Sequence, residues 1–130
     1  MKPGTLLKLA CLVAAAGCAQ FPGRESPEHA ARMNGAGDAY LECMTQEAEK
    51  DAKSAASAED IATAAHARCW PAWDAYRSAT NANFAYNART DDEKQYARDR
   101  ADAHLREFER EARRAVVDSA IERTLKPRTP

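Results

Sequence analysis

Four cysteines are the residues of this 130-residue chain with the most readily interpreted chemistry: Cys11, Cys18, Cys43 and Cys69. A thiol can accept a lipid, form a disulfide or bind a metal ion, and its surroundings decide between these outcomes. The first two cysteines lie in an apolar N-terminal stretch, whereas the last two lie in charged, alanine-rich sequence. We therefore expect the two pairs to have different roles.

Cys18 follows a segment with a basic start, an apolar core over residues 6–16 and the small residues Ala15, Ala16 and Gly17. The core has eleven residues and contains Lys8, whereas a membrane span needs about 20 predominantly apolar residues. These parts are typical of a secretory signal. Residues 1–19 resemble the signal peptides of bacterial lipoproteins, whose lipobox ends in the cysteine that is acylated.

The resemblance implies cleavage before Cys18 and the attachment of fatty acyl chains, such as palmitate, to its thiol and amine. Residues 1–17 would then be the signal peptide, and residues 18–26 the lipidated N-terminus and a short linker. In this class an Asp after the cysteine tends to retain the protein in the inner membrane, and residue 19 is Ala. The resemblance thus implies an outer-membrane protein of the bacterial cell envelope that faces the periplasm.

Two alternatives concern the processing of this segment. Cys11 is a poor acylation site, because Lys8 stands where the family carries an aliphatic residue. Ordinary cleavage after Ala19 remains an alternative, with Gly17 and Ala19 as the small residues. It gains weight from Ala15, which occupies the position where lipoproteins usually have a large aliphatic side chain.

Cys43 and Cys69 remain after processing, and two cysteines in an oxidising compartment predict one disulfide. The turn between their two predicted helices centres near Ala56, thirteen residues from each cysteine. Both helices rise about 1.5 Å per residue, so the two cysteines should lie level in an antiparallel hairpin. The same symmetry places Tyr40 beside Ala72 or Trp73. Closing this loop should stabilise the fold by roughly 3 kcal/mol.

Other reactive side chains give weaker signals. His66, Cys69 and His104 could be imagined as metal ligands, but Cys69 already has a partner and His66 is expected on an alanine-rich surface. His29 is isolated and expected to be exposed. Carboxylates between residues 91 and 111 alternate with arginine, as on a solvated helix face. We assign no catalytic, cofactor-binding or metal-binding residue and expect a non-enzymatic protein, with a small hydrolase as the weakest alternative.

Aromatic residues between 70 and 86 are the best candidates for contact with a partner. Trp73 and Tyr76 share a stripe with Cys69 and are expected in the core. Trp70 is one residue off this stripe, and Phe84 and Tyr86 lie among asparagines near the helix end. Together they form a candidate partner surface, since Trp and Tyr are favoured at protein contacts. The plainer alternative is that they cap the end of a small helical bundle.

Caps and apolar periods predict three helices and no strand. The first begins with Ser26 and Pro27 and should bend or break at Asn34–Gly37, because each glycine costs about 1 kcal/mol in a helix. The second begins near Ser57 and should kink at Pro71. The third begins with the capping box Thr90-Asp91-Asp92-Glu93 and ends before Pro127. Its expected inner face comprises Tyr96, Ala103, Leu105, Phe108, Ala112, Val116, Ser119 and Ile121.

The fold prediction is therefore all-α: a small antiparallel three-helix bundle with a disulfide-linked hairpin and a kinked second helix, over residues 27–126, before a tail at 127–130.

Loss of Lys2 and Lys8 with the signal peptide leaves 17 basic against 20 acidic residues, which argues against nucleic-acid binding. We expect an envelope lipoprotein that acts as a binding or assembly subunit, with an envelope protein or a second copy as partner. The alternative is a small secreted or periplasmic inhibitor or ligand-binding protein. The sequence names no cofactor.

Overall fold

The computed structural model describes residues 26–126, and this part of the chain is helical with no strand. Four helices follow one another: α1 (Pro27–Lys50), α2 (Ala58–Arg68), α3 (Trp70–Ala85) and α4 (Asp91–Leu125). The predicted all-α class is thus confirmed. Predictions for residues 1–25, including Cys18 and Cys11, and for the tail at 127–130 lie outside the described residues.

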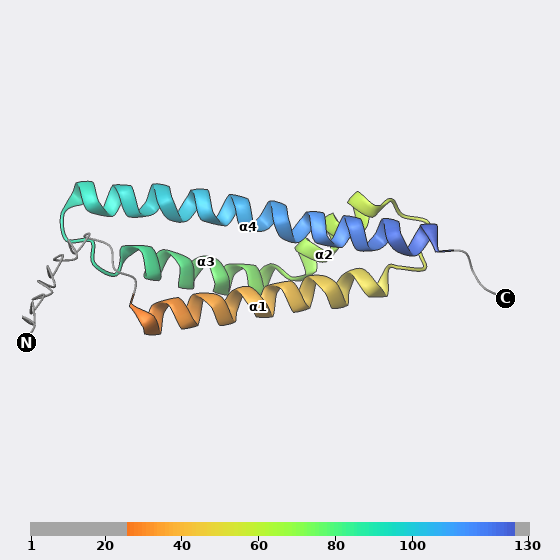
Figure 1. The fold of residues 1–130 in the computed structure, drawn as a ribbon, viewed down its shortest axis with the longest axis horizontal. Helices are drawn as coiled ribbons and strands as arrows, with labels where there is room; N and C mark the ends of the chain where they lie inside the picture. The colour runs from red at the N-terminus through yellow and green to blue at the C-terminus, as the bar shows by residue number, and fades with distance from the viewer. Residues whose placement is uncertain (1–25, 127–130) are drawn as a thin grey trace, which may run out of the picture.

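The helices form an elongated molecule in which the chain reverses direction twice (Figure 1). Helix α1 runs from one end to the other, α2 and α3 return one after the other, and α4 runs the whole length again. The start of α1 and the α3–α4 connection therefore lie at one end. The α1–α2 connection and the last turns of α4 lie at the opposite end.

Helix α1 is continuous, so the predicted bend or break at Asn34–Gly37 is wrong. Tertiary packing explains why a glycine is used here. A Cβ atom on Gly37 would lie 3.1 Å from Cε2 of Tyr76 and 3.3 Å from Cζ of Phe108, whereas one on Gly35 would meet nothing within 4 Å. Gly37 therefore lets two aromatic rings approach the backbone of α1, and the packing this permits offsets the helix-propensity cost.

The predicted second helix is divided into two helices at Cys69, where a kink at Pro71 had been expected. Proline has no N–H to donate and its ring crowds the preceding turn, which accounts for an interruption at this point. Backbone bonds continue on both sides: the N–H of Cys69 donates to Ala65 and its carbonyl accepts from Trp73. Cys69 is thus held at the junction by its neighbours in both helices.

Helix α4 begins as predicted. The Thr90 side chain accepts from the backbone N–H of Glu93, and the Glu93 side chain accepts from the backbone N–H of Thr90.

The inner face of α4 is only partly as expected: Leu105, Ala112 and Val116 are buried and Phe108 packs on the core. Four other expected members are exposed, namely Tyr96, Ala103, Ser119 and Ile121. The buried stripe instead continues toward the start of α4 through Ala97 and Ala101.

Alanine and aromatic residues dominate the core. Tyr40, Ala62, Ala65 and Tyr76 are at most 2% exposed, and small side chains let the helices come close. Tyr40 lies 5.1 Å from Trp73 between ring centroids, which confirms the neighbour expected from the symmetry of the hairpin. Trp73 and Tyr76 are buried as predicted.

Candidate functional site

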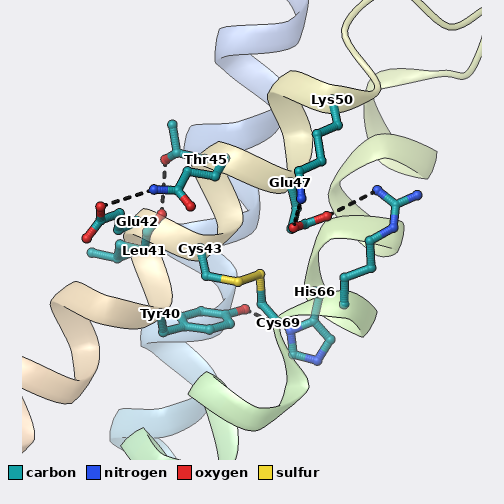
Figure 2. The surroundings of a disulfide bond; sticks show 11 residues. Tyr40, Leu41, Glu42, Cys43, Thr45, Glu47, Lys50, His66 and Cys69 are labelled. Carbon is teal, nitrogen blue, oxygen red and sulfur yellow. Dashed lines mark hydrogen bonds and ion pairs between the residues drawn. A yellow bond between two sulfur atoms is a disulfide. The ribbon is translucent and has the colours of Figure 1, made fainter.

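The Cys43–Cys69 disulfide joins two segments of the helical domain, and Figure 2 shows its surroundings. Cys43 lies in the second half of α1, and Cys69 lies at the junction of α2 and α3. Their Cα atoms are 5.9 Å apart, within the range that a disulfide requires. The predicted pairing is confirmed, and it ties α1 to both helices of the returning segment.

A hydrogen bond lies beside the disulfide and joins the same two segments. The hydroxyl of Tyr40 is 2.7 Å from Nδ1 of His66, and Figure 2 shows the phenol pointing at the imidazole below the two sulfur atoms. Each of these residues precedes a disulfide cysteine by three positions in its own segment. The covalent link and the hydrogen bond therefore reinforce one contact between α1 and α2.

Burial controls the protonation of this pair. Burial, with a smaller contribution from the negative charge of Glu109, raises the pKa of Tyr40 to about 12. Burial also lowers the pKa of His66, against the opposing effect of Glu109. The His66 side chain is 14% exposed, so the expectation that it lies on an alanine-rich surface is wrong. The phenol and the neutral imidazole are thus the favoured forms.

The polar contacts continue from this pair to α4. Nε2 of His66 is 3.8 Å from Oε1 of Glu109, whose carboxylate accepts from Nε of Arg113 at 3.2 Å. Arg113 also donates to the hydroxyl of Thr63 on α2 at 3.2 Å. We call the set Tyr40, His66, Glu109, Arg113 and Thr63 the polar bridge. It connects α1, α2 and α4 at the level of the disulfide.

The order hydroxyl, imidazole, carboxylate resembles the order of groups in a nucleophilic triad. Its chemistry differs, because Tyr40 is 0% exposed and its pKa is raised rather than lowered. A hydroxyl that holds its proton and meets no solvent cannot attack a substrate. The polar bridge is therefore suited to positioning helices.

The residues considered as metal ligands are engaged elsewhere. Cys69 is in the disulfide, His66 binds Tyr40, and Nε2 of His104 is 2.8 Å from the hydroxyl of Tyr76. Within residues 26–126, no group of three His, Cys, Asp or Glu side chains is placed to hold a metal ion. The structure thus does not bring these candidates together as a ligand set.

All three histidines of the chain contact a tyrosine. Besides the two hydrogen-bonded pairs, the ring of His29 lies 4.7 Å from that of Tyr86, so the expectation that His29 is isolated is wrong. The two hydrogen-bonded pairs join different helices, α1 to α2 and α3 to α4, and their partners are 26 and 28 residues apart. Neither pair was predicted from the sequence, because no pattern within one helix shows which side chain reaches across from its neighbour.

The three residues of the predicted partner surface do not form one patch. Trp70 starts α3 and Tyr86 follows its end, so about 24 Å of helix separates them. Phe84 packs on the core and lies 5.6 Å from the ring of His104. Trp70 and Tyr86 are exposed, at 48% and 54%. They are two separate candidates for contact.

Trp70 projects from the junction next to the polar bridge. Its ring lies edge-on to His66 at 6.1 Å, and the guanidinium of Arg77 lies 5.8 Å from its centroid. Arg77 in turn pairs with Asp74. A half-exposed indole held between a cation and a partly buried imidazole is restricted in its orientation, which reduces the entropy that a partner contact would cost.

Two of the surface hollows in the described part are open to solvent. One of about 640 Å³ lies along one helix and is lined by Ala103, Arg106, Glu107, Glu109, Arg110 and Arg113. The other, of about 240 Å³, lies between the α1–α2 connection and the last turns of α4, with Ala52, Ile61 and Ile121 in its lining. The larger hollow reaches the polar bridge at Glu109 and Arg113 but adds no buried reactive group to it.

Comparison of the chain with family models, curated proteins and solved structures finds no match. Among the helices that the structure describes, none is long and apolar enough to cross a membrane.

Proposed function

We propose that this chain is a lipoprotein of the bacterial envelope, anchored to the outer membrane through Cys18 and facing the periplasm, and that it acts as a non-enzymatic binding or assembly subunit. The observation that carries the proposal is the Cys43–Cys69 disulfide. Disulfides persist in oxidising compartments such as the periplasm and are rare in the cytosol. A lipobox ending at Cys18 would export the chain to that compartment, so the two features support each other.

The proposed architecture suits a small module presented at a membrane. It is an antiparallel three-helix bundle in which α2 and α3 together form the middle segment, and the disulfide and the polar bridge fasten this segment to its neighbours. A domain of this size buries a limited core, so a covalent link of this kind matters for its stability. The bundle would keep its shape without a ligand and would serve as a fixed platform for side chains such as Trp70.

The non-enzymatic part of the proposal is supported by the state of the reactive groups. The thiols at Cys43 and Cys69 are oxidised to a disulfide, and the Tyr40 hydroxyl is buried. Trp70, in contrast, is presented to solvent beside Arg77. Trp and Arg are both enriched among the residues that dominate binding energy at protein interfaces.

Substitution of the two N-terminal cysteines tests the anchoring. The full chain is produced in a bacterial host that processes lipoproteins, and its membranes are separated by density. The wild-type protein and the matched control Cys11→Ser should fractionate with the outer membrane as acylated species. The Cys18→Ser protein should lack the acyl chains and leave that fraction. Equal fractionation of all three proteins would refute the lipid anchor.

Substitution of exposed side chains tests the binding role. Trp70→Ala should abolish crosslinking to an envelope protein while the helical circular dichroism signal stays unchanged. Leu41→Ala is the matched control, because Leu41 is also an exposed apolar side chain, at 37%, but lies on α1. A loss of helicity in Trp70→Ala would assign Trp70 to the core, and unchanged crosslinking would remove it from the contact.

A further inference from the structure

One end of the molecule differs from the rest in its aromatic residues and its charge. We call it the anchor end: residues 27–34 of α1, residues 81–90 at the end of α3 and in the α3–α4 connection, and residues 91–100 of α4. Figure 1 shows these segments together at the end where the described chain begins. The α1–α2 connection and Leu125 lie at the far end.

Both exposed tyrosines of the described chain lie at the anchor end. Tyr86 is 54% exposed and Tyr96 is 64% exposed, whereas Tyr40 and Tyr76 in the core are at most 2% exposed. Arg100 donates to the Tyr96 hydroxyl at 3.2 Å, and its guanidinium lies 5.9 Å from the ring centroid. An exposed phenol with a cation beside it has an apolar body and a polar edge. Such side chains are favoured at the level of lipid headgroups.

The charge of the anchor end is balanced, unlike that of the remaining helices. It carries five acidic and five basic residues: Glu28, Asp91, Asp92, Glu93 and Asp99 against Arg32, Arg89, Lys94, Arg98 and Arg100. The rest of residues 26–126 holds 14 acidic and 10 basic residues, an excess of four negative charges. An anionic lipid surface would repel the rest of the molecule more than this end.

The length of chain before α1 determines which end can reach a membrane. Nine residue steps separate Cys18 from Pro27, and even when fully extended they span at most about 32 Å. Helix α1 has 24 residues and is about 36 Å long, so the far end lies at least one such length beyond the point where the linker joins. A lipid at Cys18 would thus hold the anchor end near the bilayer.

From these observations we propose that the anchor end is the membrane-facing surface of the protein, with Tyr86 and Tyr96 in contact with the phospholipid headgroup layer. This inference rests on the lipid anchor proposed above. The helices then point away from the bilayer. Trp70 lies about 24 Å further along α3 than Tyr86 and is presented to the periplasm, where it can meet a partner.

Hydroxyl-radical footprinting of the lipidated full chain in vesicles of phosphatidylethanolamine and phosphatidylglycerol tests this orientation. Oxidation is located by peptide mass spectrometry at Tyr86, Tyr96, Trp70 and Leu125, all of which are exposed side chains. Flotation of the vesicles establishes that the protein is bound. The Cys18→Ser protein that stays at the bottom of the same gradient supplies the rates for the free chain.

We expect oxidation of Tyr86 and Tyr96 to fall at least about twofold in the floated protein, since the rate follows the exposed area that the headgroups cover. Oxidation of Trp70 and Leu125 should equal that of the free chain. A floated protein with unprotected tyrosines, or with protection at Leu125 or Trp70 instead, would overturn the orientation and leave the anchor standing. A wild-type protein that does not float would overturn the anchor and the orientation together.

Discussion

Loss of the Cys43–Cys69 disulfide should destabilise the fold by about 3.5 kcal/mol. The two cysteines are 26 residues apart, and the chain-entropy treatment of a loop of that length gives this value at 25 °C. For a domain of about 100 residues, that loss corresponds to a fall in Tm of roughly 15–25 °C. The loop that the link closes runs from Cys43 to Cys69 and includes the end of α1, the α1–α2 connection and all of α2.

Guanidinium unfolding followed by circular dichroism measures this effect in three samples: the oxidised protein, the reduced protein, and the double variant Cys43→Ala/Cys69→Ala. The reduced protein and the variant should both unfold at a lower denaturant concentration than the oxidised protein. The variant should be insensitive to reductant, which controls for other effects of the reagent. Equal midpoints for oxidised and reduced wild-type protein would refute the reasoning, because the link would then restrict nothing in the unfolded chain.

Three further experiments test the packing of α1, the helix caps and the partly buried His66. Gly35→Ala should raise the free energy of unfolding by about 0.5–1 kcal/mol through helix propensity. Gly37→Ala should lower it, because its Cβ would press on the rings of Tyr76 and Phe108. Thermal unfolding that shows the same gain for both variants would contradict this packing. Thr90→Ala should lower the free energy of unfolding by about 1 kcal/mol, whereas Ser26→Ala should leave it nearly unchanged, since the Ser26 side chain makes no capping bond. Equal urea midpoints for these two variants would count against the capping box. Burial lowers the pKa of His66, so its contribution to stability is fully present above about pH 6.5 and is lost as the pH falls below that value. Urea unfolding between pH 7.5 and 5.5 should show this decline in the wild type and a weaker one in His66→Gln. The same dependence of stability on pH in both proteins would refute the reasoning.

Much of the fold follows from local signals in the sequence. The capping box at Thr90 sets the start of α4 because it satisfies backbone groups within four residues. The disulfide pairing followed from equal distances to a turn together with an expected oxidising compartment. The first inference needs only local helix chemistry, the second adds the compartment expected from residues 1–19, and neither needs knowledge of how side chains pack.

Features that depend on tertiary packing were missed. Gly37 is read from the sequence as a helix breaker, and only the rings of Tyr76 and Phe108 show why it sits inside a continuous helix. Ala97 and Ala101 form part of the buried stripe of α4, but an alanine suits the surface of a helix as well as its core, so its position carries little signal.

The candidate site likewise combines features that local sequence patterns predict with features that depend on tertiary packing. Trp70 was singled out correctly as a residue off the buried stripe, and it is exposed. The prediction that Trp70 and Tyr86 share one surface is wrong, because the length of α3 separates them. The hydrogen bond of His66 joins it to Tyr40 of another helix, which no pattern within one helix reveals.

The mass of the mature protein, purified from membranes without reductant and digested, tests the central claim most directly. The account predicts that the chain begins at an acylated Cys18 and that Cys43 and Cys69 resist alkylation until reductant is added. A mature chain that begins at Gln20 without acyl groups, or free thiols at Cys43 and Cys69, would contradict it.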